Sequence, residues 1–264
     1  MKKGKQVNST TEWPWQAAII QTGYGLHAFQ CAGTLIDREW VLTAAHCAKT
    51  HLFHIRPTNF TFIFGTLSAS DGFDLTSAPK SDSPADRPTV QTAHGIELRQ
   101  HPQYDGINKN DVALFKISPP VVYTDSVRPV CLPKNDDDAL TFRRKAYVTG
   151  WGMGRGGGWH LDSLQEARVR ISDQERCVKI YNQAGYAVIT TSMFCALGDH
   201  GEDTCKGDSG GPLMEKSVDN RWFQYGVTST ALDHGCSIAI PSVYQRVSHY
   251  CDWIEEATKM KLCQ

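Results

Sequence analysis

A single serine in this chain stands in a run of residues that suits nucleophilic chemistry. Residues 205–212 read Cys-Lys-Gly-Asp-Ser-Gly-Gly-Pro, which places Ser209 between glycines that let the backbone turn tightly. A serine hydroxyl exposed in such a turn, with free backbone N–H groups beside it, can attack a carbonyl carbon and stabilise the oxyanion that forms. Because serine followed by glycines is also common in plain loops, this chemistry requires partner residues elsewhere in the chain.

Two further segments offer those partners. A serine hydroxyl is a weak nucleophile at neutral pH, so it needs a base, and the base needs a group that fixes its tautomer. His46 ends the apolar run Leu-Thr-Ala-Ala of residues 42–45, and Asp111 leads into the apolar run Val-Ala-Leu of residues 112–114. A carboxylate at the mouth of a buried strand is unusual unless it is paired. Taken alone, such a histidine is more often structural and an Asn-Asp pair is more often a turn.

The elements that must position these residues are predicted to be strands. Short apolar and β-branched runs recur between Gly, Pro, Asp and Ser, and their lengths favour strands over helices. These runs are residues 17–20, 40–43, 60–64, 111–117, 146–149, 167–171 and 223–228. The pattern indicates an all-β sandwich or barrel protein. Only the tail has helical spacing, with Asp252 at the N-cap position, and residues 68–90 are expected to form a long surface loop.

Composition excludes several classes of function. The chain has 264 residues, 41% of them hydrophobic, and a formal net charge of -1, so neither a nucleic acid nor a membrane surface is an expected partner. No apolar stretch is long enough for a transmembrane helix, and the lysine-rich start lacks the apolar segment of a signal peptide. Nine cysteines indicate an oxidising compartment, hence a secreted or extracellular protein. The sequons at Asn8 and Asn59 are compatible with glycosylation there.

Several motifs, in order along nearly the whole chain, resemble those of the chymotrypsin/trypsin-like serine proteases. Besides the three segments above, they are Trp-Pro-Trp-Gln (13–16), Cys-Ala-Gly-Thr-Leu-Ile (31–36), Val-Arg-Pro-Val-Cys-Leu-Pro (127–133), Thr-Gly-Trp-Gly (149–152) and Pro-Ser-Val-Tyr (241–244). The resemblance implies an all-β fold of two packed six-stranded antiparallel β-barrels with a C-terminal α-helix. The barrels would cover about 13–117 and 131–250, the helix about 252–262, and residues 1–12 would form an atypical N-terminal segment.

The resemblance also implies a role for each chemical group. Ser209 would be the nucleophile, His46 its base, and Asp111 the group that orients His46. The backbone N–H groups of Gly207 and Ser209 would form the oxyanion hole. The activity would be that of a serine endopeptidase acting on proteins or peptides. No cofactor or metal is expected, and protein inhibitors are conceivable partners.

A specificity pocket is implied as well. Asp203 would lie at its floor, which resembles trypsin and favours cleavage after Arg or Lys. The residues implied to bind substrate are Asp203, Thr204, Ser229, Thr230, Ala231 and Ser242. The walls depart from trypsin, because Thr230 and Ala231 replace a tryptophan and a glycine, and Ser242 replaces a second glycine. These side chains are expected to narrow the pocket.

The start of the chain does not fit the family pattern. Active members begin with Ile-Val-Gly-Gly or a close variant, and the new ammonium pairs with the aspartate before the nucleophile, here Asp208. Counting back from Trp13, the matching stretch is residues 2–5, Lys-Lys-Gly-Lys, whose lysines would bury charge. We therefore expect Asp208 to lack its usual partner and the chain to be zymogen-like. The alternative is a weakly active or non-catalytic homologue that binds or regulates other proteins.

The resemblance implies three disulfides: Cys31–Cys47, Cys177–Cys195 and Cys205–Cys236. Cys131 occupies a position that links many relatives to an upstream pro-region, which leaves such a partner open. Cys251 and Cys263 would lie about 18 Å apart on a single continuous helix, too far apart to pair. The glycines at 152, 154 and 157 match a dinucleotide-binding pattern, but no convincing helix follows them. The elbow of α/β-hydrolases is likewise disfavoured, because only a β-like tail follows Ser209.

Overall fold

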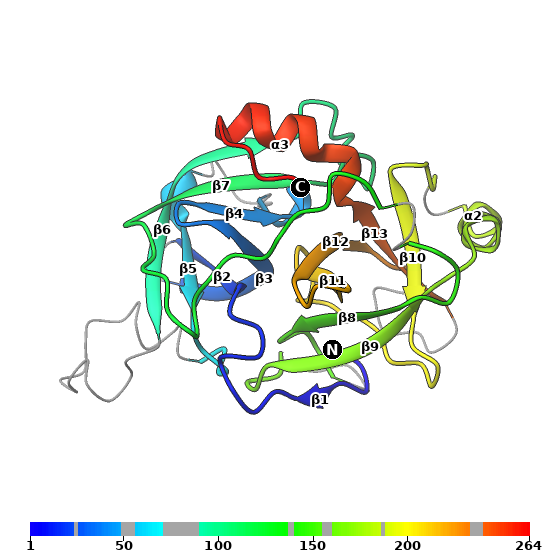
Figure 1. Cartoon of the computed structure of the whole chain (residues 1–264), viewed down its shortest axis with the longest axis horizontal. Coiled ribbons are helices and arrows are strands. Elements are labelled where there is room, and N and C mark those ends of the chain that lie inside the picture. Colours follow the sequence, from blue (N-terminus) through cyan, green and yellow to red (C-terminus); the bar gives the residue numbers. More distant parts are fainter. Residues whose placement is uncertain are drawn as a thin grey trace.

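The computed structural model of the chain describes residues 1–23, 26–48, 56–70, 90–136, 140–154, 160–185, 188–232 and 240–264. Within these ranges the chain forms two β-barrels that pack against each other, with helix α3 lying across the top of the first (Figure 1). The expected surface loop over 68–90 falls largely outside the described residues, as does Cys236.

The first barrel is a closed ring of six antiparallel strands in the order β2-β3-β4-β7-β6-β5. Its strands are β2 (Gln16–Gly23), β3 (Leu26–Asp37), β4 (Trp40–Thr43), β5 (Phe60–Phe64), β6 (Gln91–Gln100) and β7 (Ala113–Ser118). Every residue of β4 and β5 is buried, which explains why these two strands read as unbroken apolar runs. Ring closure leaves this barrel without a free strand edge.

The second barrel is built in the same way from the C-terminal half. Its strands are β8 (Lys145–Gly150), β9 (Gln165–Ile171), β10 (Met193–Leu197), β11 (Pro212–Lys216), β12 (Trp222–Thr230) and β13 (Ser242–Arg246). They pair in the order β9-β10-β13-β12-β11-β8, and a β8–β9 pairing closes the ring. The short strand β1 (Lys5–Gln6) pairs antiparallel with the start of β9, with Lys5 opposite Glu166 and Gln6 opposite Gln165. The predicted fold of two six-stranded barrels with a C-terminal helix is thus confirmed.

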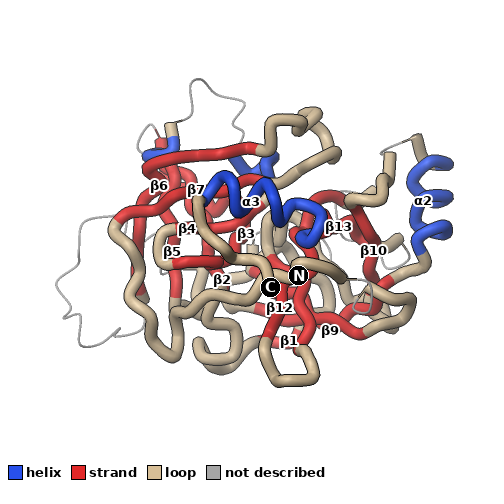
Figure 2. The backbone as a smooth tube through the Cα atoms, turned by 45° about the horizontal axis from the view of Figure 1, so that its top comes forward, coloured by secondary structure: helices blue, strands red, loops and turns tan. Residues whose placement is uncertain are grey.

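Two helices differ from the sequence-based expectations. Helix α2 (Gln174–Gln183) was not predicted, although the Asp173 carboxylate caps it by accepting a hydrogen bond from the Arg176 N–H. It stands at the edge of the second barrel (Figure 2) and buries only Cys177 and Tyr181, so most of its residues are polar. Short 3₁₀ turns η1 (Ala45–Ala48), η2 (Pro57–Asn59) and η4 (Val247–Tyr250) complete the described helical structure.

Helix α3 (Cys251–Thr258) is shorter than the expected 252–262, and Tyr250 rather than Asp252 precedes its first turn. The helix ends because Lys259 adopts a left-handed conformation with φ 62°. The chain then reverses, and Cys263 returns to form a disulfide with Cys251. The expectation that these cysteines could not pair was wrong, since it rested on one continuous helix. Bridges also join Cys31 to Cys47 and Cys177 to Cys195. Cys205 is disulfide-bonded, whereas Cys131 is a free thiol.

An aromatic cluster joins the two barrels. The Trp13 and Trp222 rings lie 4.8 Å apart in an edge-on arrangement, and Trp15 Nε1 donates a hydrogen bond to Met214 Sδ at 2.7 Å. One continuous set of buried apolar side chains includes residues of both barrels. The barrels are therefore held in a defined relative position, which any site between them requires.

Candidate active site

His46 and Asp111 come together at one end of the first barrel. His46 lies in η1, directly after β4, and Asp111 lies two residues before β7, the strand that pairs with β4. His46 Nδ1 is 2.7 Å from Asp111 Oδ2, and the His46 backbone N–H donates to Asp111 Oδ1 at 2.8 Å. The carboxylate thus holds both the ring and the backbone of the histidine. Nδ1 serves as the donor in this contact, which leaves Nε2 as the basic nitrogen of a neutral ring.

Asp111 is fully buried and its carboxylate is satisfied by hydrogen bonds. Besides the two contacts from His46, Oδ2 accepts a hydrogen bond from the Ser229 hydroxyl at 2.7 Å. Ser229 lies on β12, so this contact crosses from the second barrel to the first. The buried carboxylate thus has three hydrogen-bond donors, which hold it in a fixed position beside the His46 ring.

Ser209 lies in the turn between β10 and β11, on the second barrel. The turn depends on two glycines in the left-handed region: Gly207 at φ 93° and Gly210 at φ 77°. A Cβ on Gly210 would lie 2.0 Å from Thr43 Oγ1, so the turn packs directly against β4. The Ser209 carbonyl accepts a hydrogen bond from the Ala32 N–H at 2.9 Å. Ser209 is therefore held against the barrel that carries His46.

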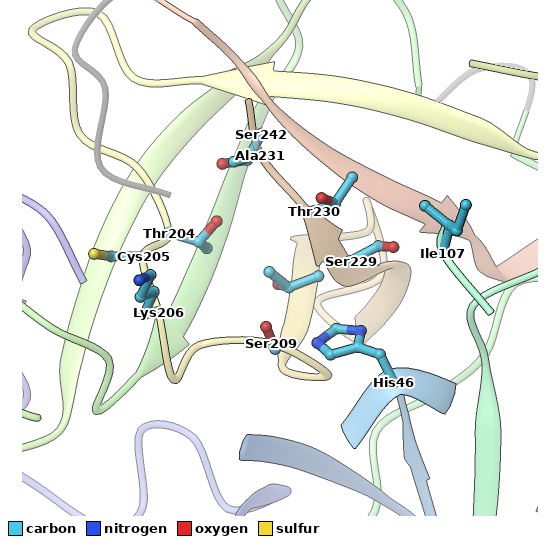
Figure 3. A pocket seen from close by; sticks show the side chains of 11 residues that line it. His46, Ile107, Thr204, Cys205, Lys206, Ser209, Ser229, Thr230, Ala231 and Ser242 are labelled. Atoms are coloured by element: carbon cyan, nitrogen blue, oxygen red, sulfur yellow. The ribbon is translucent and has the colours of Figure 1, made fainter. Parts of the chain in front are cut away.

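Ser209 and His46 line one cavity of about 310 Å³. In Figure 3 both stand at one end of this cavity, whereas Ser242 and Ala231 lie toward the other. All residues that were expected to bind substrate line the cavity except Asp203; they are Thr204, Ser229, Thr230, Ala231 and Ser242. Ile107, which the sequence did not single out, also lines it. The backbone N–H groups of Gly207 and Ser209 meet no acceptor within the described part of the chain, so they are available to an incoming oxyanion.

Asp203 lies behind the cavity wall and is only 1% exposed. Burial raises the pKa of its carboxyl to about 8, although the neighbouring Ser242 hydroxyl and the Thr204 N–H both favour the ionised form. The Thr204 N–H donates to Asp203 Oδ1 at 2.8 Å, whereas Ser242 Oγ falls short of full hydrogen-bond geometry. This buried carboxyl is therefore neutral in a large share of molecules at neutral pH.

Lys2 lies next to this carboxyl and is itself buried, with 3% exposure. Its backbone N–H donates to the Asp203 carbonyl at 2.8 Å, and the Asp203 N–H donates back at 3.2 Å. The charge of Lys2 lowers the pKa of Asp203, against the larger effect of burial. A lysine at this point therefore places a cation of the protein itself close to the Asp203 carboxyl.

The α-ammonium of Met1 pairs with Asp208, contrary to our expectation. Met1 N is 2.8 Å from Asp208 Oδ2, both groups are fully buried, and the ammonium also donates to the carbonyls of Gly152 and Met153. The count back from Trp13 was wrong by one residue: Met1 occupies the apolar position assigned to Lys2, and its side chain joins the second barrel's core. Asp208 is thus not an unpaired buried acid in this structure.

The Gly-Trp-Gly motif of residues 150–152 makes room for this ion pair. A Cβ on Gly150 would lie 2.1 Å from Asp208 Oδ1, and one on Gly152 would lie 2.5 Å from the same carboxylate. The Gly152 and Cys205 N–H groups donate to the two carboxylate oxygens, each at 2.8 Å. Asp208 therefore links the N-terminus, residues 150–152 and the Ser209 turn into one buried unit.

No cofactor site emerges from the described residues. The one group of potential metal ligands found there is Cys31, His46 and Cys47, and the two cysteines are consumed by their mutual disulfide. None of the described helices is long and apolar enough to span a membrane.

Comparison with known proteins places this chain in a family. The Trypsin family model matches residues 2–254. Human serine protease 41 is 34% identical over 248 residues, which covers 92% of this chain and 71% of that protein. Mouse transmembrane protease serine 11G is 33% identical and matches over 53% of its length, and ovochymase of Halocynthia roretzi is 32% identical over 14% of its length. Family match, relatives and the two-barrel fold agree, and this chain belongs to the trypsin family of serine proteases.

Proposed function

We propose that this chain is a serine endopeptidase that cleaves peptide bonds through an acyl-enzyme formed on Ser209. The observation that carries the proposal is the arrangement around Asp111, whose buried carboxylate holds His46 Nδ1 at 2.7 Å while His46 and Ser209 share one cavity. Membership of a protease family implies protein or peptide substrates, and the site supplies a nucleophile, a base and oxyanion donors.

In the proposed reaction, Ser209 Oγ attacks the scissile carbonyl while His46 Nε2 takes the hydroxyl proton. Asp111 stabilises the imidazolium, and the N–H groups of Gly207 and Ser209 stabilise the tetrahedral oxyanion. His46 then gives the proton to the leaving amine, and the bond to the new N-terminus breaks. Water repeats the sequence on the acyl-enzyme, with His46 again as base, and releases the acid product.

We propose Arg or Lys as the residue before the cleaved bond. The buried carboxyl of Asp203, next to the cavity-lining Thr204, supports this preference, because a guanidinium or ammonium that reaches it in a dry pocket would form a strong contact with a carboxylate. Ser242, Ala231 and the nearby charge of Lys2 all oppose it, so selectivity over neutral side chains is expected to be weaker than that of a pocket with glycines at those positions.

The site is tested directly by labelling and cleavage. A fluorophosphonate probe should label the wild-type chain at Ser209 and leave Ser209→Ala unlabelled, as peptide mapping by mass spectrometry would show. A panel of fluorogenic peptides that vary only at the residue before the reporter should then rank Arg and Lys first. Absence of labelling in a folded chain with a free Met1 amine would reject the enzyme in favour of a binding or regulatory homologue. A preference for small or aromatic residues would reject the proposed specificity alone.

We also propose an extracellular site of action, either secreted or tethered through sequence outside this chain. The disulfides support an oxidising compartment, and relatives include transmembrane proteases. Asn8 is exposed and Asn59 is partly exposed, so both are open to glycosylation. The thiol of Cys131 is half-buried and available to a partner such as a disulfide-linked pro-region. Release of mass by a peptide N-glycosidase from secreted material would test the two sequons.

A further inference from the structure

Gln245 is a fully buried glutamine on β13 that the reaction described above does not use. Its amide meets partners on three segments. Nε2 donates to the Asn108 carbonyl at 2.7 Å and to the Ser229 hydroxyl at 3.1 Å, and Oε1 accepts a hydrogen bond from the Tyr250 hydroxyl at 2.8 Å. Both N–H groups and the carbonyl of the amide are therefore engaged.

These contacts determine the direction of each hydrogen bond. The Tyr250 hydroxyl has the Ser192 hydroxyl as a further partner, and it donates to Gln245 Oε1. The Gln245 oxygen therefore faces Tyr250, and the NH₂ group faces Ser229. An amide NH₂ group can donate hydrogen bonds but cannot accept them, so Ser229 Oγ must be the acceptor in this contact. The single hydroxyl proton of Ser229 is then left to be donated to Asp111 Oδ2, at 2.7 Å.

We propose that Gln245 is a positioning residue for the reaction: it aims the Ser229 proton at Asp111 and secures the loop that carries Asp111. The second part follows from the contact with Asn108, which lies three residues before Asp111 in the same loop. Asn110, directly before Asp111, has φ 54°, and its side-chain oxygen lies 3.3 Å from the Tyr250 hydroxyl. A loop in this conformation needs support from its surroundings.

Consecutive hydrogen bonds that are buried away from water polarise and strengthen one another. Donation by Gln245 makes the Ser229 hydroxyl a better donor to Asp111, which in turn fixes the position of His46. Gln245 acts through Ser229 and Asp111 and does not line the cavity, so its loss should alter the rate of the chemical step and leave substrate affinity unchanged. This inference rests on the proposed function only in its kinetic part, because the contacts themselves do not require a substrate.

The test is a double-mutant cycle with a matched control. The variants are Gln245→Met, Ser229→Ala and their combination, and the control is Gln224→Met, since Gln224 is equally buried on the adjacent strand and bonds Gly226 instead. Gln245→Met should slow fluorophosphonate labelling about fivefold, the size of one lost hydrogen bond, with KM for a peptide within about twofold. In the Ser229→Ala background the same change should cost less than about twofold. Equal losses in both backgrounds, or equal losses for Gln224→Met, would overturn the proposal.

A second readout does not depend on turnover. The proton on His46 Nδ1, held by Asp111, is followed by ¹H NMR across a pH titration. Its resonance should shift or broaden in Gln245→Met and match wild type in Gln224→Met, and an unchanged resonance would overturn the proposal. If Gln245→Met does not fold, Tyr250→Phe removes the hydroxyl that orients the amide, and it must produce the same NMR change. Should the wild-type chain not react with the probe, the proposed function fails while NMR still decides the role of Gln245.

Discussion

At the scale of single residues, Asp203 shows how strongly burial acts on one carboxyl. Burial raises the pKa of Asp203 to about 8, with a smaller contribution from the charge of Asp208, although Ser242, the Thr204 N–H and Lys2 favour the ionised form. A substrate cation must therefore meet a carboxyl that is often protonated at neutral pH, and its binding must release that proton. Affinity for Arg and Lys side chains is thereby linked to pH.

Asp203→Asn tests this linkage. Because the folded-state pKa lies above the unfolded value of 3.8, ionising Asp203 destabilises the fold progressively as pH rises from about 4 to about 8. The amide has no such cost, so the variant should gain several degrees in Tm over wild type at pH 8.5 and little at pH 4. For wild type, kcat/KM on an Arg peptide relative to a neutral one should rise through pH 8, and the variant should lack this rise. Calorimetry and pH-dependent kinetics measure the two effects, and a pH-independent Tm difference would contradict the assignment.

Gly207→Ala tests the geometry of the oxyanion donors. Gly207 has φ 93°, and an added Cβ would lie 2.4 Å from His160 Nδ1. The substitution must displace either the ring or the backbone N–H, so kcat should fall at least about a hundredfold, the cost of losing one oxyanion donor. Steady-state kinetics on a peptide substrate measure this loss of kcat. Gly185→Ala is the control, since it also has positive φ but no atom within 4 Å of the added Cβ, and activity close to wild type is expected.

At the scale of elements, the C-terminal segment shows how one residue changes the path of a chain. Helix α3 ends at Thr258 because Lys259 turns left-handed, and the tail then runs back beside residues 132–134. The Cys263 N–H and Leu262 N–H both donate to the Glu255 carboxylate, and the disulfide to Cys251 closes the segment. The tail is thus fastened far along the chain from Ser209.

Replacing both Cys251 and Cys263 by serine should lower stability without altering catalysis. Closing a segment of this length stabilises a protein by about 3 kcal/mol, which corresponds to a Tm loss of about 5–10 °C in a chain of this size. Scanning calorimetry measures the loss, while kcat/KM at 25 °C should stay within about twofold because the tail does not line the cavity. A large loss of activity with unchanged Tm would show that the tail serves the site instead.

The strands were predictable where burial on both sides made them continuously apolar, and β4 and β5 begin and end at the predicted residues. Helix α2 was not predictable, because it buries only two residues and its mostly polar sequence resembles that of a loop. The Cys251–Cys263 bridge was not predicted, because the helical spacing of apolar residues continues past Lys259 in the sequence. The left-handed conformation of Lys259, which ends the helix, has no signal in the residue types. At the candidate site, residue types and motifs predicted His46, Asp111 and Ser209, which the fold brings to one region. The sequence did not single out Gln245 or Ile107, or the effect of Lys2 on Asp203, because their neighbours are set only by the fold.

At the scale of the whole molecule, the site exists only because two barrels meet. His46 and Asp111 belong to the first barrel, Ser209 and Ser229 belong to the second, and contacts such as Ser229 to Asp111 cross between them. The N-terminus contributes as well, because its ammonium and Asp208 fix the turn before Ser209 from inside the second barrel. Chain segments distant in sequence therefore share one buried electrostatic unit.

Asp208→Asn should uncouple this unit. The Met1 ammonium would lose its counter-charge in a fully buried place, a change that costs about 3–5 kcal/mol when one partner of a buried pair is removed. The expected result is a loss of labelling by fluorophosphonate of more than about a hundredfold, with far-ultraviolet circular dichroism retained. Asp219→Asn, at an exposed ion pair with Arg221, is the control and should be silent in both assays. Full labelling of Asp208→Asn would mean that the turn forms without the pair.

The buried ammonium has a consequence for the chemistry of the protein's amines. Acylating reagents modify only amines that they can reach, and Met1 N is fully enclosed beside Asp208, whereas side chains such as Lys5 and Lys261 stand in solvent. Under mild conditions the surface lysines should be acylated while the terminal amine is spared. The fraction of chains acylated at Met1 would then measure how often the N-terminus leaves its buried pairing with Asp208.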